Sequence, residues 1–101
     1  MKKVLLISAP TIATKMLSKQ IVDAADGQIE MAVLPESVAR DRVAEFDILL
    51  LSPGLRFLLD RPDRINMPEN MPVAVLDSRH FGDINGEEIY AQIREIYSNL
   101  S

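Results

Sequence analysis

The sequence predicts an α/β fold, a three-layer sandwich around a four-stranded parallel sheet, on two observations. Four short apolar runs are separated by segments with helical patterning, as in chains that alternate strands and helices. The runs at residues 4–7 and 48–51 are continuous rather than alternating, which is typical of parallel strands buried on both faces. With four strands joined by right-handed crossovers, we expect the order 2-1-3-4, numbered along the sequence.

The composition is that of one small globular domain, placed here over residues 1–101. Hydrophobic residues make up 48% of the chain and charged residues 26%, so a packed core is expected. The net charge is −4 and the basic residues are scattered, which argues against nucleic acid as a partner. The chain has no Cys, which excludes disulfides, thiolate metal sites and cysteine nucleophiles.

The first residues do not have the pattern of a targeting or membrane segment. The basic pair Lys2-Lys3 is followed by an apolar run that stops at Ile7. Such a run is too short for the core of a signal peptide and for a membrane span. We therefore expect a cytoplasmic protein with no direct membrane insertion.

The first strand and the first helix are predicted over residues 3–8 and 12–25. Thr11 is the expected N-cap, since Thr accepts hydrogen bonds from the first helical turn. Apolar residues recur at helical spacing in this helix, at Ala13, Leu17, Ile21 and Ala24. The pair Asp26-Gly27 is typical of a helix end.

Residues 28–34 are predicted to form an edge strand, because apolar side chains alternate there with more polar ones. Pro35 ends this strand, and Glu36-Ser37 opens a short helix. The apolar residues of that helix, which we expect to face the core, are Val38, Val43 and Ala44.

The second half of the chain continues the alternation of strands and helices. A doubly buried strand is expected at residues 47–51, followed by a short helix at 55–59. Residues 60–71 are rich in Pro, Asp and Asn and are predicted to be a loop. A fourth strand at 72–76 and an amphipathic helix at 87–100 complete the fold.

The loop after the first strand is the expected functional centre. Ligands of such sheets bind beyond the carboxyl ends of the strands, where the strand order reverses, here between the first and third strands. This placement gathers residues 8–14, 52–56 and 77–81. The first N–H groups of a helix lack partners within it and carry the positive end of its dipole, so the loop is a natural seat for a phosphate or other anion.

Three classes of protein use this geometry. A receiver domain needs carboxylates at the strand ends for Mg²⁺, but the first strand ends in Ser8-Ala9, and Asp47 lies at the opposite end of its strand. A flavodoxin-type flavin binder needs flat side chains around the ring, but the chain has no Trp, and Tyr90 and Tyr97 are best explained as packing residues of the last helix. A phosphocarrier needs a nucleophile where Ser8 stands.

Four segments in fixed order and spacing carry a resemblance to a known family. They are the first strand with its loop, residues 33–36 (Val-Leu-Pro-Glu), residues 47–53 (Asp-Ile-Leu-Leu-Leu-Ser-Pro) and residues 72–78 (Pro-Val-Ala-Val-Leu-Asp-Ser). Together they resemble the enzyme IIB component of the lactose/cellobiose class of the bacterial phosphoenolpyruvate-dependent sugar phosphotransferase system. The resemblance implies phosphoryl transfer from a IIA partner to a sugar held by a membrane IIC partner, and no cofactor.

The resemblance also implies roles for individual residues. The first strand of the family ends in a cysteine that accepts the phosphoryl group, and Ser8 stands at this catalytic position. The residues implied to bind the phosphate are Ala9, Thr11, Ile12, Ala13 and Thr14. Possible accessory groups are Lys15, Arg56, Arg79 and His80, and no metal site is implied.

The loop departs from the family pattern in three ways. A serine hydroxyl is a poorer nucleophile and leaving group than a thiolate. Pro10 removes one backbone donor, and Thr11 replaces a glycine that lets the backbone approach a phosphate closely. Two hypotheses therefore stand: a IIB-type phosphocarrier, and a non-catalytic regulatory or protein-binding module on the same fold. Whether the chain is an enzyme is left open.

Overall fold

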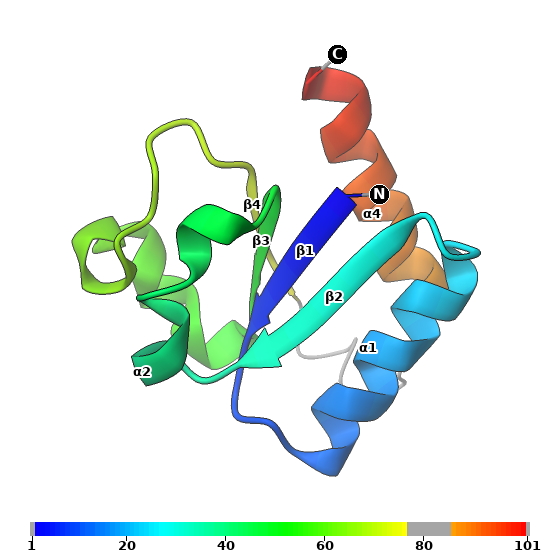
Figure 1. Ribbon diagram of the computed structural model, residues 1–101, viewed down its shortest axis with the longest axis horizontal. Coiled ribbons are helices and arrows are strands. Elements are labelled where there is room, and N and C mark those ends of the chain that lie inside the picture. Colours follow the sequence, from blue (N-terminus) through cyan, green and yellow to red (C-terminus); the bar gives the residue numbers. More distant parts are fainter. Residues whose placement is uncertain (1, 77–85, 101) are drawn as a thin grey trace.

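The structure, a computed structural model, describes residues 2–76 and 86–100 (Figure 1). Its strands are β1 (Lys2–Ile7), β2 (Ile29–Leu34), β3 (Ile48–Leu51) and β4 (Val73–Val75). All neighbouring pairs are parallel, and the order across the sheet is β2-β1-β3-β4. The predicted sheet and its strand order are confirmed.

β1 is the central element, because it pairs with β2 on one side and with β3 on the other. In register, Val4 lies beside both Met31 and Ile48. The four residues from Val4 to Ile7 are completely buried, as are the four residues of β3. Continuous apolar runs therefore occupy the doubly covered strands, as expected for a parallel sheet.

Two long helices cover one face of the sheet, α1 (Ile12–Ala24) and α4 (Gly86–Leu100) (Figure 1). Side chains of β1 and β3 pack against them in one buried cluster. Its members are Val4, Leu6, Leu17, Ile21, Ala25, Ile29, Ile48, Leu50, Leu76, Ile89 and Ile93. Asp26 and Gly27, both with positive φ, then turn the chain from α1 towards β2.

Short helical turns cover the other face and complete the three layers (Figure 1). They are α2 (Glu36–Ala39) and the 3-10 helices η1 (Val43–Glu45), η2 (Pro53–Leu59) and η3 (Pro62–Ile65). The buried cluster on this face consists of Leu5, Ile7, Ala39, Val43, Leu49, Leu51, Leu58 and Ile65. No helix in the described ranges is long and apolar enough to cross a bilayer.

Three inward-facing positions were predicted wrongly. Val38 and Ala44 are exposed, and Ala39 is buried in their place, because α2 ends after four residues and the helical spacing does not continue into η1. Ala13 is also exposed, while Thr14 is buried in the first turn of α1; Leu17 and Ile21 are buried as predicted.

The segment predicted to be a loop at residues 60–71 contains one turn of 3-10 helix. Pro62 opens η3, and Asn66 ends it in the left-handed conformation. Ile65 within this turn is fully buried in the second cluster. The signals were the proline at the start and the asparagine at the end, both of which are favoured at helix boundaries.

Candidate functional site

Ser8 lies directly beyond β1, between the ends of the two neighbouring strands. Its N–H donates to the carbonyl of Leu34 at 3.0 Å, and the N–H of Ser52 donates to the carbonyl of Ile7 at 3.3 Å. The loops after β1 and β3 therefore meet at one edge of the sheet, as predicted. The third predicted segment of this site, residues 77–81, lies outside the described residues.

The Ser8 side chain is buried, with 7% of the residue exposed. Within residues 2–76 and 86–100, no hydrogen bond to its hydroxyl is formed, from a carboxylate or any other group. A buried hydroxyl without a partner is uncommon, because such a group loses its bonds to water without replacing them. Ser8 is therefore a buried polar group at this edge with unused hydrogen-bonding capacity among the described residues.

Thr11 is the N-cap of α1, as predicted, and it forms a reciprocal cap with Thr14. The Thr14 N–H donates to the Thr11 hydroxyl at 3.2 Å, and the Thr11 N–H donates to the Thr14 hydroxyl at 2.9 Å. The Thr14 hydroxyl in turn donates to the carbonyl of Ala9 at 2.9 Å. The polar groups of both threonines are thus engaged within the loop itself.

Three backbone donors of the loop are not engaged in this cap. The N–H groups of Ala9, Ile12 and Ala13 make no hydrogen bond in the part of the chain that the structure describes. Pro10 contributes no donor. Since donors at a helix start attract anions, the loop offers an incomplete cradle beside the Ser8 hydroxyl.

The predicted accessory residues are only partly placed. Lys15 is exposed on α1 and Arg56 is exposed on η2, and neither forms an ion pair with another described residue. Arg79 and His80 lie outside the described residues. The structure therefore places two exposed cations on the elements that flank the loop, and no hydrogen bond between described residues joins either of them to Ser8.

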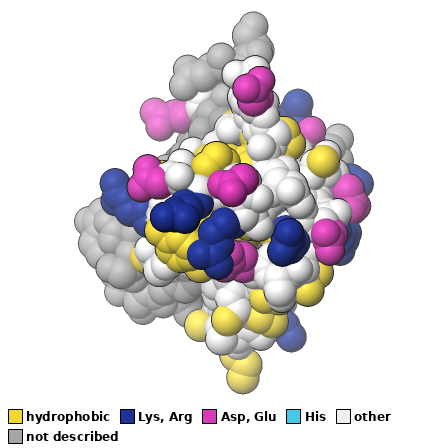
Figure 2. All heavy atoms as spheres, turned by 90° about the vertical axis from the view of Figure 1, so that its left-hand side faces the viewer, with side chains coloured by type: hydrophobic (Ala, Val, Ile, Leu, Met, Phe, Trp, Pro, Cys, Tyr) yellow, Lys and Arg dark blue, Asp and Glu magenta, His cyan; other side chains and the backbone are white. Residues whose placement is uncertain are grey.

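Apolar side chains are exposed on the elements that follow the carboxyl ends of β1, β2 and β3. Ile12 is 79% exposed and Met16 is 49% exposed. Figure 2 shows hydrophobic surface at the lower end of the molecule, the end at which α1 begins in Figure 1. We call this set the apolar rim, and its members are Ile12, Met16, Val38, Phe57 and Leu59. The sequence analysis did not identify this set, and it placed one member, Val38, in the core.

Asp47 does not belong to the site. Its carboxylate accepts the N–H of Lys3 at 2.8 Å, at the amino ends of the strands. Among the described residues, no group of three acidic or histidine side chains could hold a metal ion. A receiver domain needs carboxylates at the carboxyl ends of its strands, so the position of Asp47 at the amino ends agrees with the argument against that class.

Comparison with known proteins supports the fold. No protein-family model matches the sequence, and no curated protein matches it. Among solved structures, the cellobiose-specific phosphotransferase IIB component protein from Borrelia burgdorferi is similar, with a TM-score of 0.74 and 24% sequence identity. The match covers 97% of this chain and 93% of that chain. The chain therefore has the fold of a IIB component, as its sequence resemblance implied.

Proposed function

We propose that this chain is a cytoplasmic IIB-type component of a bacterial sugar phosphotransferase system, with residues 8–14 as its phosphate-binding loop. The observation that carries the proposal is the buried hydroxyl of Ser8, which has no hydrogen-bond partner among residues 2–76 and 86–100, beside loop N–H groups that make no hydrogen bond within the same ranges. A phosphoryl group needs several donors and gains from the positive end of a helix dipole. The fold shared with a IIB component supports the same assignment.

The transfer would have Ser8 as the acceptor. The P–N bond of a phosphohistidine on a IIA partner breaks while a P–O bond to Ser8 Oγ forms, and the hydroxyl proton passes to the histidine nitrogen that is released. The same phosphoryl group then passes to a sugar held by a IIC partner. Since no described carboxylate activates Ser8, we expect a slower transfer than a thiolate would give.

Two features favour a second function: the apolar rim, and the reciprocal cap between Thr11 and Thr14. Thr11 and Thr14 satisfy one another rather than leaving their donors for a ligand. The exposed side chains of Ile12 and Met16 beside the loop are typical of a protein-binding surface. On this reading the chain is a non-catalytic module that docks a protein partner without accepting phosphate.

Incubation with phosphorylated IIA proteins, followed by intact-mass measurement, separates the two functions. The gain of one phosphoryl group, located on Ser8 by fragmentation and lost in Ser8→Ala, supports the phosphocarrier. A stable complex with IIA and no phosphoryl gain supports the binding module. If several IIA proteins give neither a phosphoryl gain nor a complex, both proposed functions are contradicted.

A further inference from the structure

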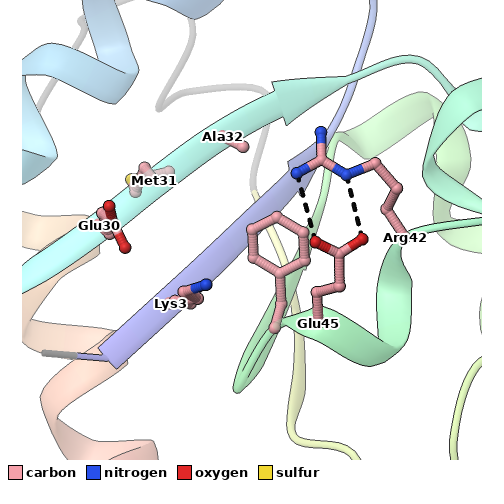
Figure 3. A pocket seen from close by; sticks show the side chains of 7 residues that line it. Lys3, Glu30, Met31, Ala32, Arg42 and Glu45 are labelled. Carbon is pink, nitrogen blue, oxygen red and sulfur yellow. Dashed lines mark hydrogen bonds and ion pairs between the residues drawn. The ribbon is translucent and has the colours of Figure 1, made fainter.

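A hollow lies at the opposite end of β1 from Ser8, on the sheet face covered by the short helical turns (Figure 3). Its volume is about 160 Å³. Pockets that hold drug-sized ligands have volumes of roughly 300–1,000 Å³, so this hollow suits a much smaller molecule. It is lined by Lys3 of β1, by Glu30, Met31 and Ala32 of β2, and by Arg42, Glu45 and Phe46 around η1.

Two of the four charged side chains in the hollow already satisfy one another. The Arg42 guanidinium donates to the Glu45 carboxylate through Nε at 3.2 Å and through a terminal nitrogen at 3.5 Å (Figure 3). The same guanidinium lies over the Phe46 ring, 5.9 Å from its centre. This pair and the ring therefore form one wall of the hollow, with no net charge.

The other two charges have no partner in the described part of the chain. Lys3 and Glu30 are register neighbours on β1 and β2, so their side chains rise from the same face of the sheet. No ion pair joins them to each other or to another described residue. In Figure 3 both side chains point out of the sheet, on the side of the hollow away from the Arg42–Glu45 pair.

The backbone beneath Lys3 is fixed in place. Its N–H donates to the Asp47 carboxylate and its carbonyl accepts the Asp47 N–H, both at 2.8 Å. This clamp sets the point from which the Lys3 side chain extends, while the sheet register sets that of Glu30. One positive and one negative group are thus presented side by side at fixed attachment points, next to apolar surface from Ala32 and Phe46.

We propose that this hollow binds a free α-amino acid with an apolar side chain. The α-carboxylate pairs with the Lys3 ammonium, and the α-ammonium pairs with the Glu30 carboxylate. The apolar side chain packs against Ala32 and Phe46. A simple anion would be repelled by Glu30 and a simple cation by Lys3, so the paired charges select a zwitterion. The site is separate from residues 8–14 and does not depend on the function proposed for them.

The test is a titration of the whole protein with L-leucine, followed by the backbone amide shifts of Lys3, Glu30 and Phe46 in ¹H–¹⁵N spectra. We expect saturable shifts with a millimolar dissociation constant. Leucinamide lacks the carboxylate and N-acetyl-leucine lacks the ammonium, and each should bind about tenfold more weakly or not at all, as for loss of one charge-assisted contact.

Variants assign the two contacts. Lys3→Gln and Glu30→Gln should each weaken leucine binding about tenfold, while Lys19→Gln, an exposed lysine on the opposite face of the sheet, should leave it unchanged. The dispersion of each spectrum reports whether the variant is folded. Absence of saturable shifts with leucine overturns the proposal. Equal binding of N-acetyl-leucine or leucinamide, or unchanged binding in either Gln variant, overturns it as well.

Discussion

The two ends of β1 are held by different kinds of contact. At the carboxyl end, Thr11 and Thr14 satisfy each other and the Ala9 carbonyl within a few residues of sequence. At the amino end, Lys3 is held by Asp47, which lies 44 residues away in the chain. The first arrangement is local and partly buried, whereas the second is long-range and exposed. The Thr11 cap was predicted from the sequence because it is local, whereas the long-range contact between Lys3 and Asp47 was not.

The largest expected effect concerns the chemistry at the carboxyl end. Ser8→Cys places a thiolate beside the incomplete cradle, and a thiolate needs no base to attack phosphorus. If the loop still holds a phosphate, we expect phosphoryl acceptance from phosphorylated IIA to rise at least about a hundredfold, the factor that general-base catalysis commonly supplies. Intact-mass time courses measure the rate.

Ser18→Cys is the matched control, because it places a thiol on α1 but outside residues 8–14 and 52–56, which meet at the site. It should gain nothing. If Ser8→Cys also gains nothing, the reciprocal threonine cap has closed the loop to phosphate, and the carboxyl end serves protein docking instead.

The second effect concerns the stability of the same end. Thr14→Val keeps the shape of the side chain but removes a buried hydroxyl that accepts from the Thr11 N–H and donates to the Ala9 carbonyl. We expect the free energy of unfolding to fall by about 2 kcal/mol. Urea denaturation measures the change. Thr11→Ser retains the capping oxygen and should lie within about 0.5 kcal/mol of the parent; equal losses in both variants would contradict this role of the cap.

At the amino end we expect a smaller effect. Asp47→Ala removes the acceptor of the Lys3 N–H, which lies in an exposed setting where water replaces it in part. The expected loss of unfolding free energy is about 1 kcal/mol. Asp23→Ala, on the surface of α1, is the control and should change stability by less than about 0.5 kcal/mol. A loss at Asp47 as large as that of Thr14→Val would show that the two ends are held equally firmly.

The smallest effect is expected for the wall of the hollow that Lys3 and Glu30 line. Arg42 and Glu45 form an ion pair whose side chains are 47% and 52% exposed. Exposed pairs contribute little, so Arg42→Ala should lower the free energy of unfolding by no more than about 0.5 kcal/mol, and by less at high salt. Urea denaturation at two salt concentrations tests this. A large, salt-independent loss would mean that packing on Phe46 outweighs the charges.

Much of the fold was predictable because its signals are local. The continuous apolar runs of β1 and β3 identify doubly buried strands, and Thr11 before a helical pattern identifies a cap. The burial of Ala39 in place of Val38 was not predictable, because α2 ends after one turn and apolar residues stand on both sides of its end. Ile65 was missed for a similar reason, because a single turn is too short to show periodicity.

The candidate site also has features that could be predicted from the sequence and features that could not. The meeting of Ser8 with the loop that begins at Ser52 follows from strand order alone. The burial of Thr14 and its hydrogen bond with the Thr11 N–H were not predicted, because the common reciprocal cap has Glu or Gln rather than Thr at the third helical position. The clamp between Lys3 and Asp47 depends on the register of β1 and β3, and this register could not be predicted from the residues alone.

The central place of β1 has a consequence for how the protein is made. Val4 to Ile7 supply side chains to both buried clusters, and each of these four residues is paired with a residue of β3. Asp47, which immediately precedes β3, is synthesised 44 residues after Lys3. At roughly 5–20 residues per second this interval is about 2–9 s. During that time the apolar residues Val4 to Ile7 of the nascent chain lack the strand that pairs with them on one side, and we expect them to be a segment that chaperones protect.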